Sequence, residues 1–184
     1  MIFPIKTALV LVFSVTRTFG AGVRPGQIKN LVTFGDSYTD IVSVGDGGTA
    51  WPVYAAGYAN VSLFPFAKSG ATCSNNITFR PFPSLFESQL PAFFNSTSTT
   101  GKTLKPDDTI YTLWLGTNDL GANALITGSD NASLVDVMEC MVNWVKVLFK
   151  SGARNFIFQN VSDHYCSGRN GRVVNRQSYH DAHR

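Results

Sequence analysis

Three short polar segments contain the residues that could perform chemistry. Ser37 carries a hydroxyl in the first segment, Gly70 lies in the second and Asn118 in the third. Acyl transfer needs a nucleophile and preorganised hydrogen-bond donors for the oxyanion that develops on the substrate. Ser37 could be the nucleophile, while its own backbone N–H, that of Gly70 and the side-chain amide of Asn118 could be the donors. A glycine suits this role because no Cβ obstructs the substrate.

The segment around Ser37 has two interpretations. Leu31 to Phe34 form a run of β-forming residues that stops at Gly35 and Asp36. Ligands of an open α/β sheet bind outside the carboxyl ends of its strands, which favours a site here. Gly, Asp and Ser are also common turn residues, so an ordinary strand-to-turn junction explains this stretch equally well by itself. The other two segments favour the nucleophile, because they supply the donors that acyl transfer needs.

Strands and helices alternate along the chain and would bring the three segments together. Strands are predicted at 30–34, 63–67, 109–115 and 155–159, and the last two are predicted to be buried. Helices are predicted at 52–59, 85–94 and 134–150, with a Ser/Thr-rich loop at 95–103. This order indicates an α/β fold with a parallel sheet and right-handed crossovers.

The helix at 134–150 has the clearest signals. Ser133 is predicted to cap it, with Asp136 as its capping-box partner. Gly152 is predicted to stop it. Apolar side chains at three- and four-residue spacing predict one stripe that faces the core, formed by Leu134, Val137, Met138, Met141, Val145, Leu148 and Phe149.

The three polar segments, in this order, resemble the first three sequence blocks of the GDSL or SGNH hydrolases. The surrounding text LVTFGDSYTD, PFAKSGATCSNN and LWLGTND is most similar to the secreted fungal acetyl esterases of carbohydrate esterase family sixteen, over roughly 30–160. The resemblance implies a flavodoxin-like three-layer α/β/α sandwich and ester hydrolysis without a metal or other cofactor. It also implies that Ser37 attacks the ester, and that Ser37, Gly70 and Asn118 hold the oxyanion. The expected substrate is a small acyl ester, acetyl in particular, of a carbohydrate.

A fourth family block, an Asp and a His spaced D-x-x-H, has no match, so the catalytic Asp and His stay unassigned. The histidines are His164, His180 and His183, and none has an Asp three positions before it. Asp181 and His183 come nearest, one residue short. Since a serine hydroxyl is a poor nucleophile without a base, we expect little or no activity from this chain. A noncatalytic carbohydrate-binding protein is the alternative function.

The segment 161–184 looks foreign to the rest of the chain. It has no hydrophobic periodicity and is rich in Arg, Asn, Ser and Gly, which predicts a disordered tail. The hydrolase domain is therefore expected over 21–160 and to be incomplete at its carboxyl end. Two explanations are open, a divergent terminus or an altered reading frame, such as an unspliced intron, near Val161.

The segment 1–20 is predicted to be a secretory signal peptide. Lys6 precedes a short apolar run, and small residues follow near Gly20. The run is too short to span a bilayer, so a secreted protein without a stable membrane anchor is expected. Four acceptor sequons predict a glycoprotein, at Asn60, Asn76, Asn95 and Asn131.

Composition and charge exclude nucleic acid as a partner. Of 184 residues 44% are hydrophobic, as in a soluble globular protein, and the formal net charge is +3. That charge belongs to the two ends, since 21–160 holds nine basic and ten acidic residues and forms no basic stripe. We expect a monomer. Cys73 and Cys140 could pair in an oxidising compartment, or Cys140 could be a core residue.

Overall fold

A four-stranded parallel sheet forms the centre of the fold. The computed structural model describes residues 22–44, 47–100, 104–121 and 132–160, without the side chains of 98–100. The sheet has the order β2-β1-β3-β4, and every neighbouring pair of strands is parallel. Its strands are β1 (Asn30–Gly35), β2 (Ser62–Pro65), β3 (Thr109–Trp114) and β4 (Asn155–Gln159). The predicted parallel α/β sheet is thereby confirmed.

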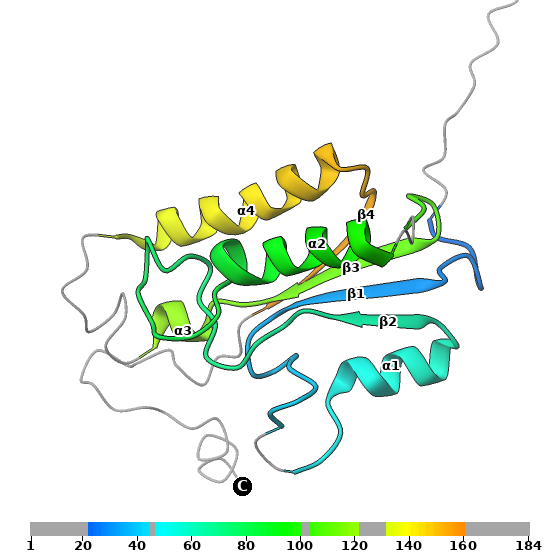
Figure 1. The fold of residues 1–184 in the computed structure, drawn as a ribbon, viewed down its shortest axis with the longest axis horizontal. Helices are drawn as coiled ribbons and strands as arrows, with labels where there is room; N and C mark the ends of the chain where they lie inside the picture. Colours follow the sequence, from blue (N-terminus) through cyan, green and yellow to red (C-terminus); the bar gives the residue numbers. More distant parts are fainter. Residues whose placement is uncertain (1–21, 45–46, 101–103, 122–131, 161–184) are drawn as a thin grey trace, which may run out of the picture.

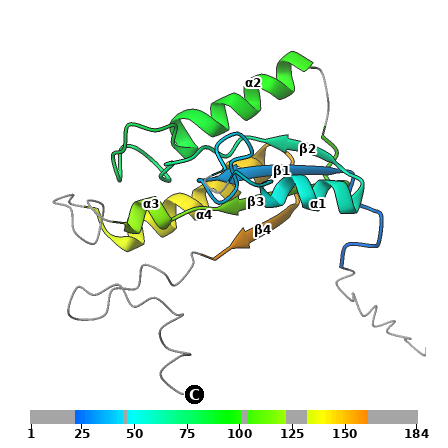
Figure 2. The same cartoon turned by 90° about the horizontal axis from the view of Figure 1, so that it is seen from below.

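Helices cover both faces of this sheet (Figure 1, Figure 2). On one face lie α2 (Leu90–Thr100) and α4 (Leu134–Lys150), and on the other lies α1 (Trp51–Ala59). A π-helical turn, η1 (Leu85–Gln89), leads into α2, and the short helix α3 (Thr117–Leu120) follows β3. These are the three α/β/α layers that the resemblance implies. No helix of the described residues is long and apolar enough to cross a membrane.

The main core lies between the sheet and the layer formed by α2 and α4. Val32 and Phe34 of β1 are fully buried there. The ring centroid of Phe34 lies 5.7 Å from that of Phe93 in α2 and 5.6 Å from that of Trp144 in α4. Aromatic contacts of this kind fix the central strand firmly. The residues that follow β1 therefore leave from a rigid element.

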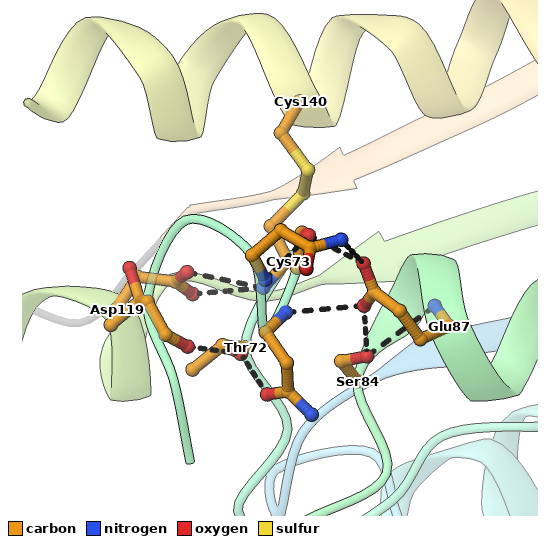
Figure 3. The surroundings of a disulfide bond; sticks show 10 residues. Thr72, Cys73, Ser84, Glu87, Asp119 and Cys140 are labelled. Atoms are coloured by element: carbon orange, nitrogen blue, oxygen red, sulfur yellow. Dashed lines mark hydrogen bonds between the residues drawn. A yellow bond between two sulfur atoms is a disulfide. The ribbon is translucent and has the colours of Figure 1, made fainter. Parts of the chain in front are cut away.

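A disulfide bond between Cys73 and Cys140 ties the loop after β2 to α4 (Figure 3). The two sulfur atoms lie 2.03 Å apart, and both residues are buried. Cys140 is therefore both a core residue and a partner in the disulfide, so both alternatives predicted for it are correct.

The buried stripe of α4 differs from the predicted one. Its capping box is confirmed, because Ser133 and Asp136 exchange side chain-to-backbone hydrogen bonds. Leu134, Met138 and Phe149 are more than half exposed, however. The buried residues are Val137, Cys140, Met141, Trp144 and Leu148. The helical spacing of the apolar residues is as predicted, but these residues form two adjacent faces of α4. The packing of Trp144 and the disulfide at Cys140 determine which of the two faces is buried.

The prediction of a loop at 95–103 is wrong for residues 95–100, because α2 continues to Thr100. Ser96 Oγ and Thr97 Oγ1 both donate to Phe93 O, at 3.0 and 3.1 Å. These hydroxyls satisfy themselves within the helix, so a Ser/Thr-rich sequence remains helical here.

The predicted burial of β4 is also wrong. Among the described strands, β4 lies last in the sheet and pairs only with β3. Ile157 and Phe158 are 45% and 50% exposed. An apolar run indicates a strand, but it does not tell a central strand from an edge strand.

Candidate active site

Three loops meet at the carboxyl ends of the parallel strands. The loop after β1 joins the loop after β2, since Asp40 Oδ2 accepts a hydrogen bond from Ser69 N–H at 2.8 Å. The loop after β3 joins it as well, since Asn118 Nδ2 donates to Ala71 O at 2.9 Å. The three polar segments predicted from the sequence are therefore neighbours in the structure.

Ser37 lies in a tight turn directly after β1. Asp36 N–H donates to Trp114 O at 3.1 Å, and Asp36 Oδ1 accepts from Tyr38 N–H at 3.0 Å. Gly35 has a φ of 145°, and a Cβ there would lie 2.2 Å from Trp114 O, so only glycine fits. The Ser37 side chain is exposed. Within the described part of the chain, neither its hydroxyl nor its backbone N–H makes a hydrogen bond, so both are available to a substrate.

Gln89, at the end of η1, stabilises the turn after β1 through hydrogen bonds with Gly35. Its side-chain Oε1 accepts from Gly35 N–H at 3.1 Å, and its Nε2 donates to Gly35 O at 2.8 Å. Only 2% of Gln89 is exposed. A buried amide that bonds both the N–H and the C=O of one residue fixes the orientation of the two peptide groups on either side of that residue. No sequence pattern marks Gln89 for this role, because its partner lies 54 residues away.

Gly70 presents a backbone N–H at the same edge of the sheet. Its φ is +80°, and a Cβ on it would lie 2.6 Å from the ring of Phe82. The backbone of the loop is thus packed directly under an aromatic ring. Among the described residues the Gly70 N–H has no hydrogen-bond partner, which leaves it available as an oxyanion donor.

The Asn118 side chain has a defined orientation. Its Nδ2 donates to Ala71 O at 2.9 Å, while its Oδ1 accepts from Arg80 Nη1 at 2.6 Å. A carbonyl needs a donor and a guanidinium needs an acceptor, so the opposite orientation of the amide would lose both bonds. One N–H of Nδ2 remains without a partner in the part of the chain that is described. The amide of Asn118 thus has a fixed orientation, while its role as an oxyanion donor stays a prediction.

Two buried carboxyl groups lie behind these donors. Neither Asp36 nor Asp119 is exposed. Burial raises the pKa of each to about 6, and the nearby charge of Asp119 adds to the rise at Asp36. Both oxygens of Asp119 accept from Cys73 N–H, at 3.1 and 3.3 Å (Figure 3). Asp119 thus holds the loop that contains the disulfide.

An aromatic wall lies next to the candidate nucleophile. The ring of Tyr38 stacks on that of Trp114, with 5.1 Å between centroids and 11° between planes. Tyr38 follows Ser37 directly and is 38% exposed. A flat aromatic surface beside a reactive hydroxyl can contact an apolar acyl group or a sugar ring.

Other predicted site residues are only partly covered by the structure. Asn60, Asn76 and Asn95 are exposed. Asn131, the segment 1–20, and the residues His164, His180 and His183 lie outside the described residues. Within the described ranges, no group of three or more His, Cys, Asp or Glu side chains could hold a metal ion.

The parallel sheet between two helical layers and the order of these three loops fit the SGNH class of hydrolases. The sequence profile of the family described as GDSL-like Lipase/Acylhydrolase matches residues 31–181, and the chain belongs to this family. The match extends past residue 160 into the segment expected to be foreign. That segment lies outside the described residues, so its origin remains a prediction.

Two fungal proteins illustrate the relationship. The chain is 28% identical over 167 residues to an acetylesterase of Hypocrea jecorina, covering 73% of this chain and 48% of that protein. It is 26% identical over 194 residues to an acetylesterase of Thermothelomyces thermophilus, covering 86% of this chain and 62% of that protein. The chain thus spans about half the length of the curated relatives it matches.

Proposed function

We propose that the protein is a serine esterase that removes acetyl or other small acyl groups from carbohydrate esters. One observation carries the proposal: the Asn118 amide is held in one orientation by Ala71 and Arg80, which leaves an N–H for an oxyanion. The exposed Ser37 hydroxyl and the Gly70 N–H lie in the loops joined to it. Nucleophile and donors therefore come from three rigidly connected loops.

The reaction would proceed by acyl transfer. Ser37 Oγ attacks the ester carbonyl carbon, and the electron pair of the C=O bond moves onto oxygen. The N–H groups of Ser37, Gly70 and Asn118 stabilise the resulting oxyanion. The tetrahedral intermediate then collapses, the C–O bond to the alcohol breaks, and a water molecule releases the acyl group from Ser37.

A base must accept the Ser37 proton in the first step and return a proton to the leaving alcohol. The described residues contain no histidine. We therefore assign the base to a histidine beyond residue 160, either one of the three in this chain or one in a longer form of the protein. Because none of the three has the D-x-x-H spacing, slow turnover by the 184-residue chain is expected.

Two observations support small acyl esters of carbohydrates as substrates. Both relatives described above are named acetylesterase. The stacked rings of Tyr38 and Trp114 next to Ser37 offer a flat surface of the kind that sugar rings contact. Secretion and glycosylation of this protein accord with such a substrate and are part of the proposal.

The function is tested by hydrolysis of p-nitrophenyl acetate. We expect slow turnover by the secreted chain, and Ser37→Ala should reduce the rate to that of buffer because the nucleophile is lost. Ser43→Ala is the matched control, since Ser43 is an exposed serine of the same loop. Hydrolysis that survives in Ser37→Ala would contradict the proposal.

A carbohydrate-binding protein without catalysis is the second candidate. It is favoured by the rings of Tyr54 and Tyr58, which stack 6.3 Å apart on α1 and are 53% and 88% exposed. Calorimetric titration with xylan oligosaccharides distinguishes the two functions. Binding without Ser37-dependent turnover would support this candidate over the esterase.

A further inference from the structure

Arg80 lies in the loop between β2 and η1 and reaches the third loop of the site. It is half-buried, and its Nη1 donates to Asn118 Oδ1 at 2.6 Å. Its guanidinium carbon lies 5.7 Å from the centroid of the Phe82 ring. Neither Arg80 nor its neighbours belong to the three polar segments, so the sequence offers no sign of this contact.

The contact restricts the Asn118 amide. With the hydrogen bond to Ala71 O alone, the Asn118 amide could rotate away, or water could replace it on Ala71 O. A guanidinium donor on Oδ1 opposes this, because a charge-assisted bond is stronger than a neutral one. The positive charge also polarises the amide, which strengthens its N–H groups as donors.

The same loop also positions Gly70. The ring of Phe82 packs so closely on Gly70 that a Cβ there would lie 2.6 Å from it. Asn75 holds the loop in place, since its Oδ1 accepts from Arg80 N–H at 3.3 Å and its Nδ2 donates to Phe82 O at 3.2 Å. One short segment thus contacts both donors that accompany Ser37.

We propose that Arg80 is a positioning residue of the oxyanion hole, which orients and polarises the Asn118 amide. The inference rests on the proposed esterase function. Arg80 acts through Asn118 and not on the substrate. Its loss should therefore slow the chemical step and leave substrate binding nearly unchanged.

Kinetics with p-nitrophenyl acetate provide the first test. Removing one oxyanion-hole donor costs about 10²–10³ in kcat, so Asn118→Ala should show a loss of that order. Arg80→Ala should lower kcat about tenfold with KM changed less than about twofold, since it only disorients that donor. Arg80→Lys, which keeps a charged donor but loses the planar guanidinium next to Phe82, should recover part of the loss.

Arg154→Ala is the matched control. Arg154 also lies over a phenylalanine ring, at 4.2 Å from the Phe149 centroid. It precedes β4, however, and so lies at the amino ends of the strands, away from the site. It should keep the wild-type kcat. A loss in Arg80→Ala that is matched by Arg154→Ala, or that falls mainly on KM, would overturn the proposal.

A double-mutant cycle separates positioning from general destabilisation. In the Asn118→Ala background, Arg80→Ala should have no further effect on kcat, because the group it positions is absent. A tenfold loss that persists in this background would show that Arg80 acts elsewhere.

A spectroscopic readout is independent of turnover. The Nδ2 protons of Asn118, assigned by their disappearance in Asn118→Ala, should shift in a ¹⁵N-labelled Arg80→Ala chain and stay in place in Arg154→Ala. Unshifted signals in Arg80→Ala would overturn the inference. If no Ser37-dependent turnover occurs but the signals shift, the esterase proposal fails for this chain while the orientation of Asn118 by Arg80 stands.

Discussion

At the scale of residues, the candidate nucleophile is positioned by backbone and buried amide groups more than by its own side chain. Gly35 packs closely against Trp114 O, and Gln89 forms hydrogen bonds with both the N–H and the C=O of Gly35. Asp36 then closes the turn through Tyr38 N–H. Ser37 is thus presented to solvent by neighbours that are themselves buried, which is the preorganisation that catalysis requires.

The buried carboxyl of Asp36 should make stability fall with rising pH. Its Oδ2 has no hydrogen-bond partner among the described residues, and burial raises its pKa to about 6 from 3.8. The folded state therefore binds this proton more tightly than the unfolded state. The stability that this proton contributes is complete below pH 3.8 and is lost as the pH rises through 6.

Asp36→Asn should remove this loss, because an amide keeps the Oδ1 acceptor and carries no charge. Relative to wild type, we expect its free energy of unfolding to be similar near pH 4 and about 1–3 kcal/mol higher at pH 7.5. Urea unfolding at both pH values measures the difference. Asp136→Asn is a control for which the change in stability with pH should have the opposite sign, because the hydrogen bond with Ser133 lowers the pKa of Asp136. A pH-independent difference for Asp36→Asn would contradict the prediction.

At the scale of elements, the loop after β2 depends on contacts with distant parts of the chain. Cys73 bonds covalently to α4, and its N–H donates to Asp119 of α3 (Figure 3). Glu87 of η1 accepts from Ser74 Oγ and from Asn75 N–H. This loop contains Gly70, so the same contacts also fix the position of one proposed oxyanion donor.

Loss of the disulfide should lower stability markedly. It closes a loop of 67 residues in sequence, so Cys140→Ser combined with Cys73→Ser should cost about 2–4 kcal/mol. Thermal unfolding by circular dichroism measures the change. Cys166→Ser, which removes the third cysteine, is the control and should leave the melting temperature unchanged. A double variant as stable as wild type would contradict the pairing.

At the scale of the whole molecule, the site and the Asn60 sequon lie at opposite ends of the strands. Ser37 follows β1 at the carboxyl ends of the strands, whereas Asn60 ends α1 just before β2 begins (Figure 1). Asn60 is exposed and adopts a left-handed conformation with a φ of 52°. A glycan there would extend away from the site.

Expression in a eukaryotic secretory host should yield chain that carries a glycan on Asn60. Ser62→Ala destroys the sequon and keeps the asparagine that the helix end requires, so it should remove one shift on enzymatic deglycosylation. Ser43→Ala, which touches no sequon, should keep the full shift. The measurement is gel mobility before and after peptide N-glycosidase. An identical pattern in Ser62→Ala and wild type would contradict modification of Asn60.

The local features of this protein follow from its sequence alone. Turn residues, apolar periodicity and capping signals are properties of neighbouring residues, so they predicted the order of the strands and helices and the Ser133 cap. They also placed Ser37, Gly70 and Asn118 after successive strands, which in a parallel sheet lie at one edge.

The pairs of distant residues that meet are known only from the folded chain. Gly35 and Gln89 are 54 residues apart, and Arg80 and Asn118 are 38 apart, yet each pair is directly hydrogen-bonded. The sheet order brings such pairs together, and packing of Trp144 selects which face of α4 is buried. These outcomes depend on long-range contacts that leave no local pattern, so the positioning of the site could not be predicted from the sequence.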